Sequence, residues 1–362
     1  MGAQKKKVFV MMSGGVDSSV AAFLLREQGA YEVIGVFIKG YNVDGCQDRE
    51  AEDARRVAEH LRISFYVIDL EEEYKHFVVE YLVNGYRNGI TPNPDVMCNK
   101  EIKFGVFLEK ALALGADFVA TGHYVQITST KVQDANGDTQ VVHALQQGVD
   151  ENKDQSYFLW TLTQDQLQYC LFPIGEYTKP EIRVIATNAG LPTAQKKDSQ
   201  GICFLGNISL RGFLEQYLPK KRGDIITMDG VKVGEHDGAW FYTIGQRHGL
   251  HIGGGPAYFV IKKDVLDNIV TVAHDDRLLA QVINCVELVD MNFMGAHAID
   301  CPKSIPVMAR IRYRQPLFSA TLIVEDERYQ LQFDAPQKFV ASGQSAVLYT
   351  PDGVVVGGGI IA

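Results

Sequence analysis

Long hydrophobic runs are missing from this sequence of 362 residues. No apolar stretch reaches the roughly 18 residues from which a membrane-spanning helix is built. Residues 1–7 end in three lysines, and an apolar segment that we expect to be a strand follows directly. For this reason we expect no targeting leader. We therefore expect a cytoplasmic protein without membrane contact. At this length the chain is too large for one ordinary core, so two or three domains are expected.

Closely spaced cysteines are missing as well. The sequence has no C-x-x-C pair and no other spacing that is typical of metal ligands, because its six cysteines are widely separated: Cys46, Cys98, Cys170, Cys203, Cys285 and Cys301. In a large cytosolic chain this pattern disfavours both a disulfide framework and a structural zinc site. We predict no protein-bound metal site, and the cysteines become candidates for chemistry.

Positive charge is in deficit, since the formal net charge is −9. Taken alone, this balance argues against a nucleic-acid partner, but phosphate contacts are local. The stretch 195–222 holds six basic residues and two acidic ones. The stretch 301–316 has no acidic residue. We predict a single strand over 306–313, and because alternate residues of a strand lie on one face, we expect its arginines to share a face. Its basic residues are Lys303, Arg310, Arg312 and Arg314. A partner of the size of a tRNA is therefore compatible with the sequence.

A strand, a glycine turn and a helix follow one another near the N-terminus. Residues 7–12 form a short apolar run, Gly14 and Gly15 interrupt it, and Asp17 opens a segment with helical spacing. This arrangement binds phosphate, because free N–H groups and the helix dipole converge on the anion. The lysine of G-x-x-x-x-G-K-[ST] and the G-x-G-x-x-G fingerprint are both absent. The motif Ser13-Gly-Gly-Val-Asp-Ser-Ser19 resembles instead the pyrophosphate loop of the ATP pyrophosphatase superfamily.

Strands and helices alternate through the first half of the chain. We expect strands over 32–38, 64–69 and 118–121 and helices over 48–61, 73–87 and 101–114. Such alternation predicts a parallel sheet with ligands at the carboxyl ends of its strands, where Ile38 and Gly122 lie. We assign residues 1–206 to this α/β nucleotide-binding domain.

Turn signals replace helices from about Asn207 onward. Short β-branched and aromatic runs at 239–244, 257–262 and 268–272 predict a small, mostly β central domain over 207–278. Five further runs predict a C-terminal antiparallel β-barrel over 279–362, and they lie at 306–313, 319–324, 329–333, 345–349 and 354–361. Residues 134–138 read as a hairpin turn between two strands.

Two cysteines lie in sequence surroundings that favour reactivity. Cys98 precedes a helix that we expect to begin near Glu101, where the helix dipole and nearby lysines stabilise a thiolate, and Asp95 is close enough to handle a proton. Cys203 follows an exposed, lysine-bearing loop. Such a pair suits sulfur transfer, in which one cysteine carries a persulfide and the other resolves it. A small buried cysteine without a chemical role fits the same residues.

Several blocks together resemble the bacterial tRNA-specific 2-thiouridylase family, in the family's order and over nearly the whole chain. The blocks are Ser13-Gly-Gly-Val-Asp-Ser-Ser19, Asn93-Pro-Asp-Val-Met-Cys-Asn-Lys-Glu-Ile-Lys-Phe104, Ala120-Thr-Gly-His-Tyr124, Lys153-Asp-Gln-Ser-Tyr-Phe158, Asp198-Ser-Gln-Gly-Ile-Cys-Phe204, Tyr242-Thr-Ile-Gly-Gln-Arg247, Arg312-Tyr-Arg-Gln315 and Gly343-Gln-Ser-Ala346. The resemblance implies an adenine nucleotide hydrolase-like domain, a small central domain and a C-terminal β-barrel.

The resemblance also implies roles for individual residues. It makes Asp95 an acid/base residue, Cys98 a nucleophile and Cys203 the persulfide carrier, with a transient Cys98–Cys203 disulfide. It places ATP against Met11, Met12, Ser13, Gly14, Gly15, Val16, Asp17, Ser18, Ile38 and Gly122. It places tRNA against Asn93, Pro94, Asp95, His123, Lys153, Asp154, Gln155, Arg312, Tyr313 and Gln344. The chain departs from the family pattern after its second strand, where Ile38 stands in place of an expected methionine.

The implied reaction is ATP-dependent replacement of the C2 oxygen of uridine 34 by sulfur in the tRNAs for Lys, Glu and Gln. Magnesium would accompany the nucleotide, and a persulfide-donating relay protein or cysteine desulfurase would supply the sulfur. Two alternatives stay open: another enzyme of the superfamily, such as a lysidine or 4-thiouridine synthetase, and a nucleotide- or RNA-binding module without chemistry.

Overall fold

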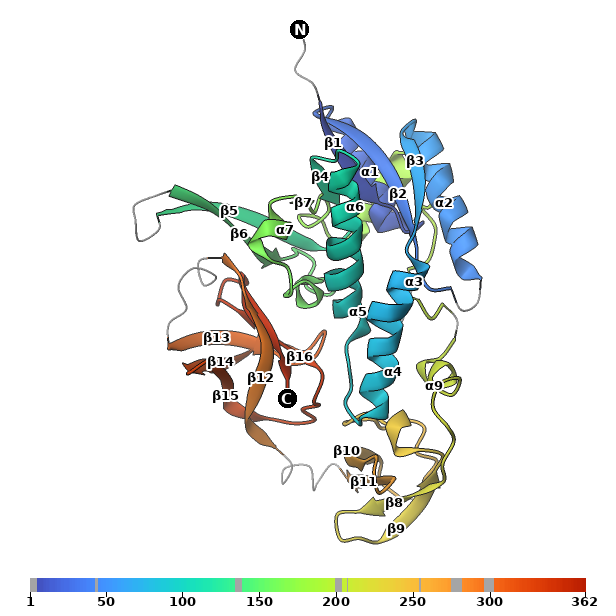
Figure 1. Ribbon diagram of the computed structural model, residues 1–362, viewed down its shortest axis with the longest axis vertical. Coiled ribbons are helices and arrows are strands. Elements are labelled where there is room, and N and C mark those ends of the chain that lie inside the picture. The colour runs from blue at the N-terminus through green and yellow to red at the C-terminus, as the bar shows by residue number, and fades with distance from the viewer. Residues whose placement is uncertain are drawn as a thin grey trace.

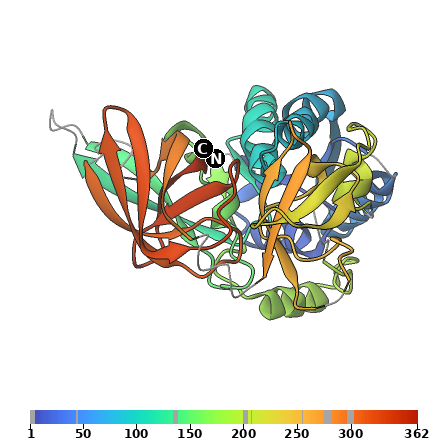
Figure 2. The same cartoon turned by 90° about the horizontal axis from the view of Figure 1, so that it is seen from below.

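The computed structural model describes residues 5–42, 45–133, 139–198, 204–206, 208–253, 255–274, 282–295 and 303–362. Figure 1 shows a parallel sheet with its helices, a small β-sheet below it, and a barrel beside both. In the view from below, the red strands of the barrel lie to one side of the blue elements of the parallel-sheet unit, and the green hairpin lies beside the barrel (Figure 2). The predicted fold class is confirmed.

The first unit is built on a five-stranded parallel sheet of order β3-β2-β1-β4-β7. β1 lies in the middle, and its side chains alternate between two buried clusters: Val8 and Val10 face one, Phe9 and Met11 the other. This burial on both faces is why the strand reads as one continuous apolar run. The strands are β1 (Lys6–Met11), β2 (Tyr31–Lys39), β3 (Ser64–Asp69), β4 (Phe118–Ala120) and β7 (Cys170–Leu171).

Helices cover both faces of this sheet. The cluster of Val8 and Val10 includes residues of α1 (Val16–Glu27), α2 (Cys46–Leu61) and α8 (Lys179–Asn188). The cluster of Phe9 and Met11 takes in the second set, which is α3 (Glu71–Tyr74), a π-helical segment (Lys75–Val79), α4 (Glu80–Arg87), α5 (Pro94–Met97), a second π-helical segment (Cys98–Val106) and α6 (Phe107–Ala113).

The helix that carries Cys98 begins earlier than the sequence predicts. Instead of starting near Glu101, it starts at Pro94, where the Asn93 side chain accepts a hydrogen bond from the backbone N–H of Val96 at 3.3 Å. Proline suits the first helical position because that residue has no N–H partner to lose. Cys98 therefore lies inside the helix rather than ahead of it, and the stabilisation of its thiolate by an exposed helix N-terminus does not apply.

A long hairpin and short helices connect the sheet to the barrel. β5 (Val125–Gln133) and β6 (Thr139–Gln147) pair antiparallel, as predicted, while the turn residues 134–138 lie outside the described residues. A 3₁₀ turn (Ser156–Phe158) and α7 (Gln164–Leu167) follow. Figure 1 shows the hairpin extending beside the barrel.

The central unit is a four-stranded sheet of order β10-β11-β8-β9, and α9 (Leu210–Leu214) precedes it in the chain. The strand expected over 239–244 is wrong: Gly238 has a φ of +147° and precedes a 3₁₀ turn, Ala239–Phe241. Phe241 and Tyr242 are adjacent and both buried, so the run lacks the alternation of a strand. The strands are β8 (Gly223–Thr227), β9 (Lys232–His236), β10 (Tyr258–Asp264) and β11 (Ile269–His274).

The C-terminal unit is a closed six-stranded barrel of order β12-β15-β14-β13-β16-β17, filled by its own apolar cluster. The long first strand, β12, has no counterpart among the sequence predictions, because exposed residues alternate through it and dilute its apolar signal. The strands are β12 (Ile283–Phe293), β13 (Ser304–Arg310), β14 (Phe318–Glu325), β15 (Arg328–Gln337), β16 (Ser345–Tyr349) and β17 (Val355–Ile361).

The arginines expected along one strand do not share a face. β13 ends at Arg310, and Arg314 has a positive φ of 63° in the turn that follows. Arg310 is buried, whereas Arg314 is exposed. The strand prediction over 306–313 was too long, because the ladder pairs of β13 end at Arg310 while apolar and basic residues continue beyond it. In the described part of the chain, no helix is both long and apolar enough to cross a bilayer.

Candidate active site

The glycine turn after β1 forms a closed loop held by serine side chains. The Ser13 N–H donates to Ser18 Oγ at 3.1 Å, and the Ser19 hydroxyl donates to the Gly15 carbonyl at 2.7 Å. Gly14 has a φ of +72°, and a Cβ there would lie 2.3 Å from the Glu50 carbonyl oxygen. Glycine is therefore required by both conformation and space. α1 begins directly after this loop, so its first N–H groups face the same region.

Gly122, just after β4, lets this strand end pack against the loop. A Cβ at Gly122 would lie 2.6 Å from the Ser18 nitrogen and 2.7 Å from the Asp17 carbonyl carbon. The sequence suggested that this glycine admits the nucleotide. In the structure its close approach is to the loop backbone that would hold the phosphates, so it shapes the site from behind.

We expect Gly122→Ala to weaken ATP binding. The added methyl group must displace backbone atoms, at a cost of about 1–3 kcal/mol, and the displaced atoms belong to the loop. Titration calorimetry with ATP measures the loss. Gly253→Ala is the control, because a Cβ at Gly253 meets nothing within 4 Å. Equal ATP affinity in both variants would contradict this role for Gly122.

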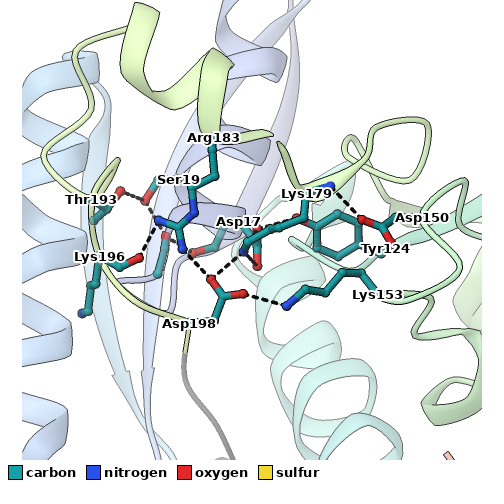
Figure 3. A network of polar contacts seen from close by, with 12 residues as sticks. Asp17, Ser19, Tyr124, Asp150, Lys153, Lys179, Arg183, Thr193, Lys196 and Asp198 are labelled. Carbon is teal, nitrogen blue, oxygen red and sulfur yellow. Dashed lines mark hydrogen bonds and ion pairs between the residues drawn. The ribbon is translucent and has the colours of Figure 1, made fainter. Parts of the chain in front are cut away.

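Behind the loop lies a network of ion pairs that the sequence did not predict (Figure 3). Lys179 Nζ lies 2.7 Å and 2.8 Å from the two carboxylate oxygens of Asp17, and the Tyr124 hydroxyl donates to the same carboxylate at 2.7 Å. Lys179 also lies 2.8 Å from Asp198, which pairs in addition with Lys153 at 2.7 Å. The network joins α1, the end of β4, the segment after β6 and α8.

A second part of the network fastens the segment 193–198 to the loop. Lys196 Nζ donates to the Gly14 carbonyl at 3.0 Å and to Asp53 at 2.7 Å. Arg183 donates to the carbonyls of Ala194 and Lys196 and, at 2.7 Å, to Asp198. Four cations thus lie around the phosphate loop: Lys153, Lys179, Arg183 and Lys196.

The electrostatics of the network keep its charges in place. Burial raises the pKa of Asp198, but the hydrogen bonds from Lys153 and Lys179 outweigh that effect and set the pKa at about 2. Burial and the neighbouring Asp17 carboxylate raise the pKa of Tyr124. At neutral pH Asp198 is therefore ionised, and Tyr124 keeps the proton that it donates to Asp17.

Asp95 and Cys98 are brought onto one helical turn, since they are three residues apart. Cys98 is buried and belongs to the large apolar cluster. Asn99 fixes the start of the helix by donating to the Asp95 carbonyl at 3.0 Å. Cys203 lies outside the described residues, so the predicted Cys98–Cys203 pair stays a prediction.

Among the residues expected to contact tRNA, three are interior: Pro94, His123 and Asp154. His123 is buried and shares a 2.7 Å hydrogen bond with Thr121, and burial lowers its pKa well below the usual value. Asp154 is buried and accepts hydrogen bonds from the Gly148 and Ser156 N–H groups. Gln155 accepts the Tyr124 N–H at 3.0 Å, and Lys153 belongs to the ion network.

The other expected tRNA contacts meet where the barrel touches the remaining units. Arg312 donates to the Ile244 carbonyl of the central unit at 2.8 Å. The Tyr313 ring lies 4.3 Å from the Phe158 ring, measured between centroids. Gln344 donates to the Thr91 carbonyl at 2.7 Å, and Thr91 lies two residues before Asn93 and three before Pro94. The barrel thus contacts the segment that leads to Asp95 and Cys98.

The remaining nucleotide-site predictions lie at the strand ends. Met11 and Met12 are buried at the end of β1, and Ile38 is half-buried near the end of β2. The isoleucine leaves an apolar wall of the kind that an adenine ring needs. No group of three or more His, Cys, Asp or Glu side chains with metal-binding geometry occurs among the described residues.

Comparison with protein-family models matches almost the whole chain in three parts. Residues 6–207 match a model described as tRNA methyl transferase HUP domain, residues 211–274 a tRNA methyl transferase PRC-barrel domain, and residues 284–361 an aminomethyltransferase beta-barrel domain. These spans coincide with the parallel-sheet, central and barrel units.

Curated proteins named tRNA-specific 2-thiouridylase MnmA are similar over nearly their full lengths. The one from Streptococcus thermophilus (strain CNRZ 1066) is 46% identical, over 99% of this chain and 95% of its own. The one from Streptococcus mutans serotype c (strain ATCC 700610 / UA159) is 44% identical, with the same two coverages. The one from Alkaliphilus oremlandii (strain OhILAs) is 45% identical, over 98% and 96%.

Proposed function

We propose, because the chain belongs to the tRNA-specific 2-thiouridylase family, that it consumes ATP to replace the C2 oxygen of uridine 34 by sulfur in tRNA. The observation that carries this function is full-length similarity combined with a phosphate loop in which Gly14 has no room for a side chain. The tRNAs for Lys, Glu and Gln are the proposed substrates.

The first step is adenylation. The C2 oxygen of the uridine attacks the α-phosphorus of ATP, an O–P bond forms, and pyrophosphate leaves. The residues proposed to hold ATP are Met11, Met12, the loop from Ser13 to Ser18, Ile38 and Gly122. Mg²⁺ would enter with the nucleotide, bound by the phosphates, which bring their own oxygen ligands. The target base must leave the stack of the anticodon loop to reach these atoms.

The second step is sulfur transfer. The terminal sulfur of a Cys203 persulfide adds at C2, and AMP leaves with the former uridine oxygen. The Cys98 thiolate then attacks the Cys203 sulfur, which frees the thiocarbonyl and leaves a Cys98–Cys203 disulfide for an external two-electron reductant. Asp95, one helical turn from Cys98, is the proposed proton acceptor. Release of hydrosulfide as the attacking species is the alternative route.

The sulfur comes from outside the chain. We propose a persulfide-donating relay protein or a cysteine desulfurase as the donor, acting in the cytoplasm, where the tRNA substrate is found. The proposed division of labour assigns 1–206 to catalysis, 207–278 to a connecting unit and 279–362 to tRNA contact. Asn93, Pro94, His123, Lys153, Asp154, Gln155, Arg312, Tyr313 and Gln344 are the proposed tRNA-facing set. Interior residues such as Asp154 would act within it by supporting their neighbours.

The function is tested by product analysis. With ATP, tRNA and a persulfide donor, we expect AMP, pyrophosphate and 2-thiouridine at position 34, identified by chromatography and nucleoside mass spectrometry. ADP and phosphate would contradict adenylation. Formation of lysidine or 4-thiouridine would assign the chain to another reaction of the superfamily. If no AMP forms, the chain is a nucleotide- or RNA-binding module without chemistry.

Arg312→Ala should make tRNA binding less dependent on salt. Each lost phosphate contact reduces the slope of log K against log salt by about 0.7 to 0.9, and filter binding at several salt concentrations measures it. Arg26→Ala is the control, because Arg26 lies at the exposed end of α1. Since Arg312 also bonds to Ile244, the melting temperature is recorded with it. An unchanged slope would assign Arg312 to the junction between units alone.

A further inference from the structure

Asp198 is bound by three cations at once. Its carboxylate oxygens lie 2.7 Å from Lys153, 2.8 Å from Lys179 and 2.7 Å from Arg183. All four side chains are part-buried, with Lys179 the most enclosed at 11% exposure. Lys179 also pairs with Asp17 inside the phosphate loop. The three cations therefore converge beside the loop, and a carboxylate lies between them (Figure 3).

Contacts other than those of Asp198 also hold the surrounding elements. α8 starts with its own capping box, in which Thr178 and Glu181 satisfy each other's backbone groups, and it packs through Ile182 and Ala186. Arg183 holds the segment before Asp198 through two carbonyls. Lys179 is already paired with Asp17. What Asp198 adds is negative charge at the centre of the cations.

Charge balance shows what the cations prefer. Counting only side chains that pair directly, Lys153, Lys179 and Arg183 contribute three positive charges against two negative charges from Asp17 and Asp198, which leaves one in excess, while Asp150 accepts the Lys179 backbone N–H. Without Asp198 the excess is two. An anion with several charges, such as a pyrophosphate group, gains more from this cluster than one carboxylate does, and guanidinium and ammonium groups are the usual partners of phosphate oxygens.

We propose that Lys153, Lys179 and Arg183 form a subsite for the outer phosphates of ATP, and that the Asp198 carboxylate occupies this subsite as an internal substitute until phosphate displaces it. The proposal deepens the proposed function and rests on its nucleotide site. Lys153, which family resemblance assigns to tRNA, becomes a phosphate ligand. Asp198 lowers the affinity for pyrophosphate and so favours its release after adenylation.

The test measures binding of inorganic pyrophosphate to the full chain by calorimetry, without ATP or tRNA. Asp198→Asn should bind pyrophosphate at least about fivefold more tightly than the unmodified chain, because a competing group is lost. Lys179→Met should bind it at least about tenfold more weakly. Asp237→Asn, which removes a carboxylate from an exposed pair with Arg211, is the matched control and should change nothing. Unchanged or weaker binding by Asp198→Asn overturns the proposal.

Hydrogen exchange of the unmodified chain keeps the test decisive if a variant does not fold. Added pyrophosphate should speed amide exchange in peptides covering residues 194–198, because a contact of Asp198 is lost, and slower or unchanged exchange counts against the proposal. Pyrophosphate binding does not require thiolation. A chain that makes no 2-thiouridine but responds in this way would overturn the proposed function alone, and an active enzyme without the response would overturn only this inference.

Discussion

Replacing Cys203 by serine should abolish 2-thiouridine formation while tRNA-dependent release of pyrophosphate from ATP continues. In the proposed mechanism, adenylation uses the phosphate loop and the base pocket. It makes no use of the persulfide, so the two half-reactions separate. The expected products are adenylated RNA and pyrophosphate, detected by mass spectrometry of the RNA and a pyrophosphate assay.

Cys285→Ser is the control, since Cys285 is exposed on β12 of the barrel. That variant should thiolate at the normal rate. Mass spectrometry of the persulfide-loaded chain should find the extra sulfur on Cys203, and one turnover without reductant should leave a Cys98–Cys203 disulfide. If Cys203→Ser still makes 2-thiouridine from a persulfide donor, the sulfur passes through another residue and the assignment is wrong.

Arg310→Met should cost about 3–5 kcal/mol of unfolding free energy, because it leaves a buried carboxylate without its cation. Arg310 Nη1 lies 3.3 Å from Asp154, and the two side chains are 9% and 0% exposed. The pair links the barrel to the segment after β6. Urea unfolding followed by tryptophan fluorescence measures the loss, since Trp160 donates to Ser345 Oγ at 3.0 Å in the same junction.

Arg314→Met provides the comparison, because Arg314 is exposed in the turn after β13 and should cost under about 0.5 kcal/mol. The double variant Arg310→Met with Asp154→Asn should recover part of the stability, since neither charge is then left unpaired. Equal stability of the two single variants would mean that Arg310 acts as a surface charge, as the sequence suggested.

Elements that depend only on short-range sequence patterns could be predicted from the sequence. β1, the glycine turn and α1 follow one another within residues 6–27, and each has its own signature of apolar runs, glycines and helical spacing. The same holds for β16, predicted with the bounds that it has, where every residue is buried. Short-range patterns of this kind need no knowledge of partners.

The ion network could not be predicted, because its members are far apart in the sequence. Asp17 and Lys179 are separated by 162 positions, and no local pattern marks either as a partner of the other. Tyr124 lies in a recognised block, yet its hydroxyl bond to Asp17 depends on how β4 meets α1. The prediction that Arg310 is exposed was wrong for another reason. A basic stretch normally indicates surface, and only the fold places Arg310 beside the buried Asp154.

The separation between Asp17 and Lys179 also determines how long after Asp17 the ribosome adds Lys179. At a chain growth of about 5–20 residues per second, the ribosome needs roughly 8–32 seconds to pass from one residue to the other. The parallel sheet is also completed late, because its strand β7, which pairs with β4, is formed by Cys170–Leu171. The phosphate loop, made among the first residues, therefore spends that interval on the nascent chain without the lysine that neutralises Asp17.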